Sequence, residues 1–425
     1  MMKTFETHES EVRGYIRSFP AVFTRAAGHE LFSEQGNRYI DLFSGAGALA
    51  YGHNPPALSE RLLDYLRSGG VMHSLDMATT AKREFIEAVQ EIVLEPRGLS
   101  YKMLFSGPTG TNAVEAAMKV ARKATRRRPV YCFEGGFHGM TLGSLSVTSN
   151  PGKRAGAGTE LHDARRLPFE GDTVNGRDSL EVVKRAFAED AERNRLPAAI
   201  IVETVQCEGG VRTASDTWLQ AIARIAREHG TLLIVDDIQA GCGRTGDFFS
   251  FERAGLTPDI VCLSKALSGI GLPLALVLLR PELDVLRPGE HNGTFRGNNA
   301  AFVTATTALR EFWRDDRLTN TVRTRAARIH ERLSAIAEEH APGASEVRGR
   351  GMVQGIHFED ASIANEISRD AFEHGLIIET AGHQDEVIKL LPRLDIPEDA
   401  LEEALDILEA SVARATAGDA VGARA

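Results

Sequence analysis

The sequence has few of the features that mark secreted, membrane or metal-binding proteins. Its four cysteines lie singly and none forms a Cys-x-x-Cys pair, so neither a metal site nor a disulfide framework is expected. No apolar run reaches the roughly 18 residues that a membrane span needs. Residues 1–6 lack the apolar core of a signal peptide. A protein of the reducing cytoplasm is therefore expected.

Positive charge is also scarce. The 425 residues include 49 Lys and Arg against 59 Asp and Glu, a formal net charge of −10. This balance gives no basic surface for nucleic acid, so a nucleic-acid partner is not expected. What the chain does have is an ordinary globular composition, with 43% hydrophobic residues, and a length that suggests two domains.

Short apolar runs alternate with helical patterns through the middle of the chain. Helices are expected over 57–67 and 80–94. Six apolar runs are typical of buried strands: 102–105, 130–133, 198–202, 232–235, 260–263 and 274–279. This alternation predicts an α/β fold with a mainly parallel sheet and helices on both faces. Sheets of this kind bind ligands at the carboxyl ends of their strands.

The two ends of the chain show a different pattern. Two short strands, 30–33 and 38–42, flank a turn near the start. A long charged helix (318–340), several short strands and an amphipathic helix (397–413) follow the middle region. We therefore expect a large domain over 57–315 and a second, smaller α+β domain over 316–425. Residues 150–177, rich in Gly, Asp and Arg, are expected to form a loop.

The most informative stretch runs from Leu232 to Gly241, where apolar residues lead directly into Asp236 and Asp237. A carboxylate at the end of a buried strand is costly unless it meets a cation or a hydrogen-bond donor. Lys265 ends the next apolar run, 265 − 236 = 29 residues further on. Because both groups end neighbouring strands, we infer that they share one partner, and that this partner is pyridoxal phosphate.

Two other predicted strand ends carry polar motifs. The turn that contains Gly110 and Thr111 opens a helix, and free N–H groups at a helix start suit a phosphate. The alternative is a plain turn between a strand and a helix. Phe137 and His138 stand between glycines, where an aromatic ring can stack on a flat ligand. The alternative is a core phenylalanine beside a hydrogen-bonded histidine.

Each of these residues has a distinct chemical task in such a site. Asp236 facing a pyridine nitrogen would keep that nitrogen protonated. Gln239 would reach the phenolic oxygen of the ring. Lys265 would bind the cofactor covalently and, once released by the amino substrate, act as a general base. A single lysine or aspartate has an ordinary structural explanation, so the prediction depends on all of them occurring together at strand ends.

These motifs resemble the class III aminotransferases, which are pyridoxal phosphate (PLP)-dependent enzymes of fold type I that act largely on ω-amino groups. The resemblance covers nearly the whole chain and is specific over 236–246, 264–267 and 291–295. It implies a seven-stranded-type sheet in the large domain and a smaller α+β domain built from both termini, with 1–56 as its N-terminal part. It places Gly110 and Thr111 at the phosphate and Phe137 and His138 at the ring. It also implies that Thr294 reaches the cofactor of a partner subunit, in a homodimer or higher oligomer.

The resemblance extends to residues that would bind substrate. Residues 203–210 are similar to the family's Glu-Pro-x-Gln-Gly-Glu stretch. This similarity implies that Glu208 pairs with a substrate-binding arginine and swings away when glutamate enters. Arg393 stands where that arginine is expected, since a guanidinium suits an α-carboxylate. Arg296 adds a cation that the family usually lacks, and we expect it to bind a carboxylate.

Several variants narrow the expected activity. Asp237 in place of the usual glutamate, together with 11–20 and 73–85, resembles the family members that convert aspartate 4-semialdehyde to 2,4-diaminobutyrate. These members take the amino group from glutamate, release 2-oxoglutarate and begin ectoine synthesis, so osmotic adaptation is implied. The alternatives are another ω-aminotransferase of the ornithine or 4-aminobutyrate type, an aminomutase, or a non-catalytic PLP-binding protein.

Overall fold

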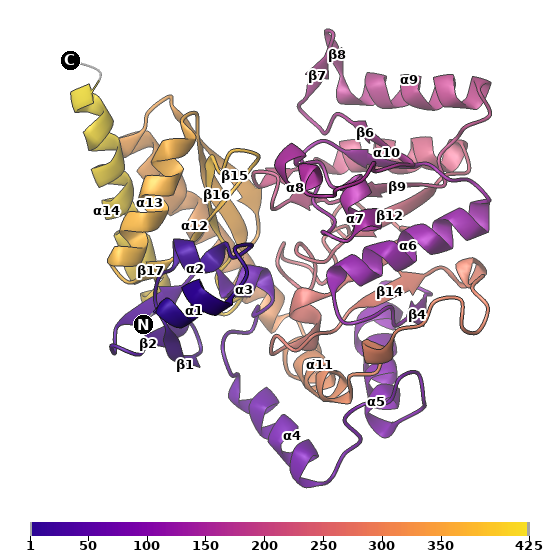
Figure 1. Cartoon of the computed structure of the whole chain (residues 1–425), viewed down its shortest axis with the longest axis horizontal. Helices are drawn as coiled ribbons and strands as arrows, with labels where there is room; N and C mark the ends of the chain where they lie inside the picture. The colour runs from indigo at the N-terminus through magenta and orange to yellow at the C-terminus, as the bar shows by residue number, and fades with distance from the viewer. Residues whose placement is uncertain (1, 423–425) are drawn as a thin grey trace.

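A twisted seven-stranded sheet forms the centre of the larger body in Figure 1. The computed structural model describes residues 2–422, with side chains described to residue 417. The strand order is β4-β14-β13-β12-β9-β5-β6. The strands are β4 (Lys102–Leu104), β5 (Val130–Phe133), β6 (Ala164–Leu167), β9 (Ala199–Val202), β12 (Leu232–Asp236), β13 (Ile260–Leu263) and β14 (Leu276–Leu279).

The prediction that the strands of this sheet are mainly parallel is confirmed. β12 runs parallel to both of its neighbours, β9 and β13, and β5 runs parallel to β9 and β6. β14 alone, among the described strands of this sheet, runs antiparallel to its neighbours β13 and β4. The polar residues that follow β4, β5, β9, β12 and β13 therefore meet at one edge of the sheet.

Helices cover both faces of the sheet, as expected for buried strands. Successive strand residues point to opposite faces: Ile234 packs in one apolar cluster with Val114 and Met118, while Val235 packs in another with Phe85. Besides the short α8 described below, the α-helices of this body are α4 (Pro56–Arg67), α5 (Thr80–Ala88), α6 (Gly110–Thr125), α7 (Leu142–Val147), α9 (Ser179–Glu192), α10 (Asp216–Glu228) and α11 (Asn299–Phe312).

The expectation of a loop over 150–177 is wrong. The short helix α8 (Pro151–Ala155) and the edge strand β6 lie there, and β6 pairs in parallel with β5. Its sequence, Ala-Arg-Arg-Leu, has no apolar run, because an edge strand is not buried on all sides. Arg165 of β6 instead forms an ion pair with Asp190 at 2.9 Å.

Both ends of the chain build the smaller body, at the left of Figure 1. One sheet joins β1 (Phe23–Ala27), β2 (Glu30–Ser33) and β3 (Arg38–Asp41) to β17 (Leu376–Ile377), which runs parallel to β3. A second, antiparallel sheet has the order β15 (Ser345–Arg350), β16 (Val353–Phe358), β19 (Val387–Leu390) and β18 (Glu379–Ala381). The smaller domain from both termini is thus confirmed, while boundaries at 56 and 315 stay predictions.

Helices at both ends of the chain pack beside these two sheets. The short N-terminal helices are α1 (Lys3–His8), α2 (Tyr15–Ser18) and α3 (Ser44–Gly47), and the C-terminal ones are α12 (Arg317–His340), α13 (Ala361–Glu373) and α14 (Glu398–Gly422). No helix in the described part of the chain combines the length and apolar character that a membrane span requires.

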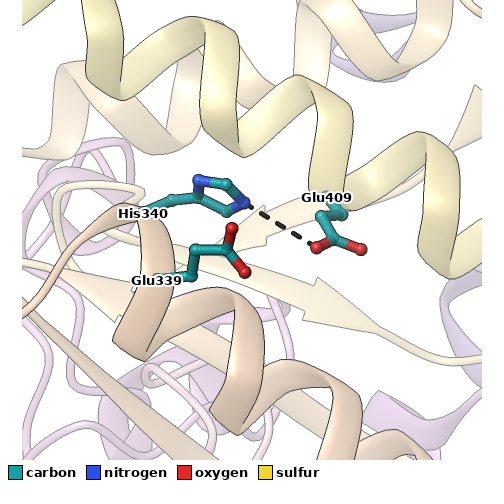
Figure 2. Close-up of side chains that lie close together, drawn as sticks. All are labelled: Glu339, His340 and Glu409. Atoms are coloured by element: carbon teal, nitrogen blue, oxygen red, sulfur yellow. Dashed lines mark ion pairs between the residues drawn. The ribbon is translucent and has the colours of Figure 1, made fainter.

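Charged contacts tie α12 to α14. Arg332 of α12 lies 2.9 Å from Glu409 of α14, and it also pairs with Glu402. Next to them, Glu339 and His340 face Glu409, with His340 Nε2 3.8 Å from Glu409 Oε1 (Figure 2). This trio is the one group of three possible metal ligands among the described residues. Because Arg332 already neutralises Glu409, we interpret the trio as part of the interhelical ion pairing.

Candidate active site

A cavity of about 160 Å³ opens at the carboxyl ends of the central strands. Eight of the predicted site residues line it: Gly110, Thr111, Phe137, His138, Glu208, Asp236, Gln239 and Lys265. They lie at or behind the ends of five different strands, so the sheet brings them together from distant parts of the sequence. A larger surface hollow at the opposite edge, beside Leu232 and Asp259, contains none of them. The predicted residues Thr294, Arg296 and Arg393 do not line the cavity.

Asp236 is fixed at the back of this cavity by two donors. His138 Nδ1 lies 2.7 Å from Asp236 Oδ2, and the backbone N–H of Ile238 donates to Asp236 Oδ1 at 3.2 Å. Both side chains are buried. Burial alone would lower the pKa of His138, but the hydrogen bond to Asp236 and nearby negative charge raise it. A carboxylate held this firmly can offer its charge to a ligand nitrogen without reorganising.

Lys265 occupies a constrained turn directly after β13. It begins a short 3₁₀ helix, Lys265–Ser268, with a left-handed backbone φ of 47°, which is uncommon for a residue other than glycine. The hydroxyl of Ser264 donates to the carbonyl of Leu274 at 2.7 Å and secures the turn. Burial lowers the pKa of Lys265, which favours the neutral amine that a nucleophile or base requires.

The start of α6 forms a ready anion site. Thr109 and Asn112 close a capping box across the first turn, while the first N–H groups of a helix have no partner within the helix. Gly110 is close to Ile238, since a Cβ at this glycine would lie 2.9 Å from Ile238 Cδ1. The close fit lets the backbone approach a phosphate directly.

The side-chain amide of Gln239 is only partly hydrogen-bonded by the protein. Its Nε2 donates to the carbonyl of Ala46 at 2.8 Å, and its Oε1 is buried without a hydrogen-bond partner among the described residues. An amide nitrogen has two hydrogens, so one remains available for a phenolic oxygen. With the anion site at one end and Asp236 at the other, the residues present fit PLP.

Phe137 and Glu203 shape the wall beside the cofactor region. The backbone N–H of Phe137 donates to Glu203 Oε2 at 2.9 Å, and Lys153 Nζ lies 4.6 Å from the centre of the Phe137 ring. Burial raises the pKa of Glu203 to about 8. Sequence reasoning missed Glu203 as a separate wall residue; its place at the end of the apolar run 198–202 was the available signal.

The expected pair between Glu208 and Arg393 is wrong. Glu208 instead accepts a hydrogen bond from Lys389 Nζ at 2.8 Å, whereas Arg393 forms a double contact with Asp395 at 2.7 Å. Lys389 lies on β19 and is fully buried, while Arg393 follows the end of that strand. Sequence reasoning missed Lys389, although a single charge inside the apolar run Val387–Leu390 was a signal.

Thr294 and Arg296 lie outside the cavity. Thr294 is exposed and precedes Phe295, whose exposed fraction is 66%. The carbonyl of Thr294 contacts His73 Nε2 at 2.6 Å. Arg296 donates to the carbonyl of His291 at 3.0 Å. Within one subunit, neither side chain contributes to the wall of the cavity.

Asp237 points away from the chemistry of Asp236. It is fully buried and accepts hydrogen bonds from the backbone N–H of Ser250, at 3.1 Å, and from the hydroxyl of the same residue. Burial raises the pKa of Asp237 to about 7. The residue whose role the sequence left open therefore fixes the loop around Ser250.

Comparisons with known proteins agree with this geometry. Residues 14–412 match the class-III aminotransferase family. The chain is 53% identical over 408 residues to a diaminobutyrate–2-oxoglutarate transaminase of Nocardia farcinica, covering 96% of this chain and 93% of that protein. It is 51% identical over 415 residues to one of Bordetella parapertussis, covering 97% and 95%. An ornithine aminotransferase structure from Toxoplasma gondii, 21% identical, superposes with a TM-score of 0.83, covering 97% of this chain and 94% of that one.

The superposition shows that the chain has the fold of that aminotransferase structure, with a cavity at the strand ends. The chain belongs to the class-III aminotransferase family. It is therefore a PLP-dependent aminotransferase, and its family membership confirms the resemblance predicted from the sequence.

Proposed function

We propose that this aminotransferase moves the amino group of glutamate to L-aspartate 4-semialdehyde in a two-step ping-pong reaction. The products are 2-oxoglutarate and L-2,4-diaminobutyrate. Two relatives that share about half of their residues with nearly the whole chain are named diaminobutyrate–2-oxoglutarate transaminase, after these two compounds. The structural observation that supports the proposal most is the meeting of Lys265, Asp236 and Glu208 in one cavity.

The residues of the cavity are assigned their tasks by position. Bound PLP would take up the amino group and draw electrons from the neighbouring carbon. Asp236, held by His138, would keep a proton on the ring nitrogen, and the start of α6 would hold the phosphate. Lys265 would anchor the cofactor and then, as a free amine, remove and return the proton at the substrate carbon.

Glu208 is proposed to adapt the cavity to two different substrates. Glutamate has a carboxylate on its reacting carbon, whereas the reacting carbon of diaminobutyrate has only hydrogen in that place. While Glu208 pairs with Lys389 at 2.8 Å, the lysine charge is neutralised and an uncharged group fits beside it. A substrate carboxylate would take the place of Glu208, so Lys389 replaces Arg393 in the proposed gate.

The proposed setting is a cytoplasmic homodimer that begins ectoine synthesis during osmotic stress. The family resemblance supports the pathway, and the exposed positions of Thr294 and Phe295 support a partner subunit on that side. Thr294 would then contact the cofactor phosphate of the partner subunit, as predicted from the sequence. Arg296, two residues further on, is proposed to bind a carboxylate from the same segment.

An acceptor panel tests this function. The purified holoenzyme is given glutamate with aspartate 4-semialdehyde, succinic semialdehyde or glutamate semialdehyde, and 2-oxoglutarate is measured. The highest kcat/KM is expected with aspartate 4-semialdehyde, with one 2-oxoglutarate released for each diaminobutyrate formed. A higher kcat/KM with another aldehyde would show that the protein is an ω-aminotransferase with a different amino acceptor. Amination without release of 2-oxoglutarate would indicate an aminomutase.

A further inference from the structure

A buried lysine behind the active-site wall has two carboxylate partners rather than one. Lys389 Nζ lies 2.8 Å from Glu208 Oε1 and 2.8 Å from Glu379 Oε1, and the lysine is fully buried. Burying a charge in this way is costly unless an opposite charge stays beside it. A single partner would be enough to neutralise the lysine, so the second carboxylate needs an explanation.

The two carboxylates are held in different ways. Glu379 lies on β18 directly opposite Lys389 of β19 in the antiparallel ladder, and its side chain is 6% exposed. Glu208 lies on the loop between β10 (Val205–Gln206) and β11 (Arg212–Thr213) and lines the cavity that contains Lys265. Backbone pairing therefore fixes Glu379, while Glu208 can leave Lys389 by a movement of its side chain.

The ammonium group of Lys389 contacts both acids at once. Its Nζ lies as close to Oε1 of Glu379 as to Oε1 of Glu208, at 2.8 Å. The lysine therefore keeps a partner in Glu379 when Glu208 leaves. Tyr15 of α2 donates to the other oxygen, Oε2 of Glu379, at 3.4 Å, so the N-terminal segment holds Glu379 from its far side.

The protonation of the two acids supports this division. Although burial alone would raise it, the charges of Lys389 and Lys265 lower the pKa of Glu208 to about 2. Burial raises the pKa of Glu379 to about 7, with the charge of Glu208 acting in the same direction. Removing the charge of Glu208 from beside Lys389 would therefore favour the ionised form of Glu379.

We propose that Glu379 is a positioning residue of the substrate site: it retains Lys389 at the cavity wall whenever a substrate carboxylate displaces Glu208. Tyr15 is proposed to orient Glu379 for this task. The inference rests on the proposed function, because it requires one substrate with a carboxylate on its reacting carbon and one without. The glutamate side of the reaction depends on Glu379, and the diaminobutyrate side, in which Glu208 stays paired, does not.

The test compares Glu379→Gln with Glu366→Gln, a change at an exposed glutamate of α13. Calorimetry measures the dissociation constant of glutarate, a dicarboxylate that has no amino group to transfer, with the PLP-loaded protein. Glu379→Gln should raise the dissociation constant of glutarate by about tenfold or more and should also raise KM for glutamate. The kcat/KM for diaminobutyrate should change by less than about threefold. Glu379→Asp should restore part of the glutarate affinity.

Two results would overturn the proposal: unchanged glutarate affinity in Glu379→Gln, or an equal loss on the glutamate and diaminobutyrate sides. If Glu379→Gln does not fold, Tyr15→Phe provides the same measurement, because the Tyr15 side chain is half exposed. The Tyr15→Phe variant should bind glutarate more weakly than the native protein, and an unchanged affinity for glutarate would again overturn the proposal. If the variants change glutarate affinity as expected but the native protein does not use diaminobutyrate, the proposed function is refuted while the role of Glu379 stands.

Discussion

At the scale of single residues, Asp236 is the side chain on which the chemistry most depends. Its two oxygens are occupied by His138 and by the backbone of Ile238, so its position does not depend on the ligand. Asp236→Ala should retain the cofactor weakly and lower the rate of the glutamate half-reaction by about 10²–10⁴-fold. Single-turnover absorbance measures the rate. An unchanged rate would contradict the proposed role of Asp236 at the ring nitrogen.

Asp237 makes a different prediction, about stability. Its pKa, about 7 in the folded protein, lies above its ordinary value of about 3.9 in an unfolded chain. Between these values the folded state binds more protons, so stability should fall as the pH rises from about 4 to about 7. Asp237→Asn removes the ionisable group and with it this dependence of stability on pH. The Tm of the native protein minus that of the variant should decrease from pH 5 to pH 7.5, and a rising difference would contradict the assignment.

Side-chain partners within the site could be predicted only in part. Asp236, Lys265 and Gln239 were accessible from the sequence because each stands close behind the end of an apolar run whose strand direction was clear. The partner of Glu208 was not, because two cations, Lys389 and Arg393, lie four residues apart and spacing does not reveal which one faces the loop. In the folded chain Lys389 donates to Glu208 at 2.8 Å, while Arg393 pairs with Asp395.

At the scale of elements, the start of α6 is expected to bind the phosphate. A Cβ at Gly110 would lie 2.9 Å from Ile238 Cδ1, so Gly110→Ala should push this turn away from the ligand. We expect the dissociation constant of PLP to rise by about tenfold or more, while the protein stays folded. Gly156→Ala, where the nearest atom would be 3.4 Å away, is the control. Equal PLP affinity in both variants would exclude the start of α6 as the phosphate site.

Most elements of the large domain could be predicted because their signals are local. Strands β5, β9, β12 and β13 each coincide with an apolar run, since strands buried on both faces need apolar residues throughout. β6 escaped prediction because an edge strand tolerates arginines. The pairing of β17 with β3 joins segments more than 300 residues apart, and no local pattern contains that information; the family resemblance supplied it.

At the scale of the whole molecule, the proposed dimer predicts active sites shared between subunits. Lys265→Ala and Thr294→Ala proteins should each have low activity at limiting PLP. After unfolding and refolding together, each hybrid dimer would contain one site with both native residues, Lys265 from one subunit and Thr294 from the other. Recovered activity in the mixture is expected, and refolding each variant alone is the control. No recovery in hybrids shown to form would argue against a shared site.

The central claim is that Asp236 and Lys265 meet on one PLP molecule. Its most direct test is reduction of the holoenzyme with borohydride, followed by peptide mass spectrometry and by absorbance of the Lys265→Ala variant. The reduced cofactor should be found on the peptide that contains Lys265, and the variant should lose both the absorption of the lysine-bound cofactor and nearly all turnover. Cofactor attached to another lysine, or turnover of Lys265→Ala at the native rate, would contradict the account.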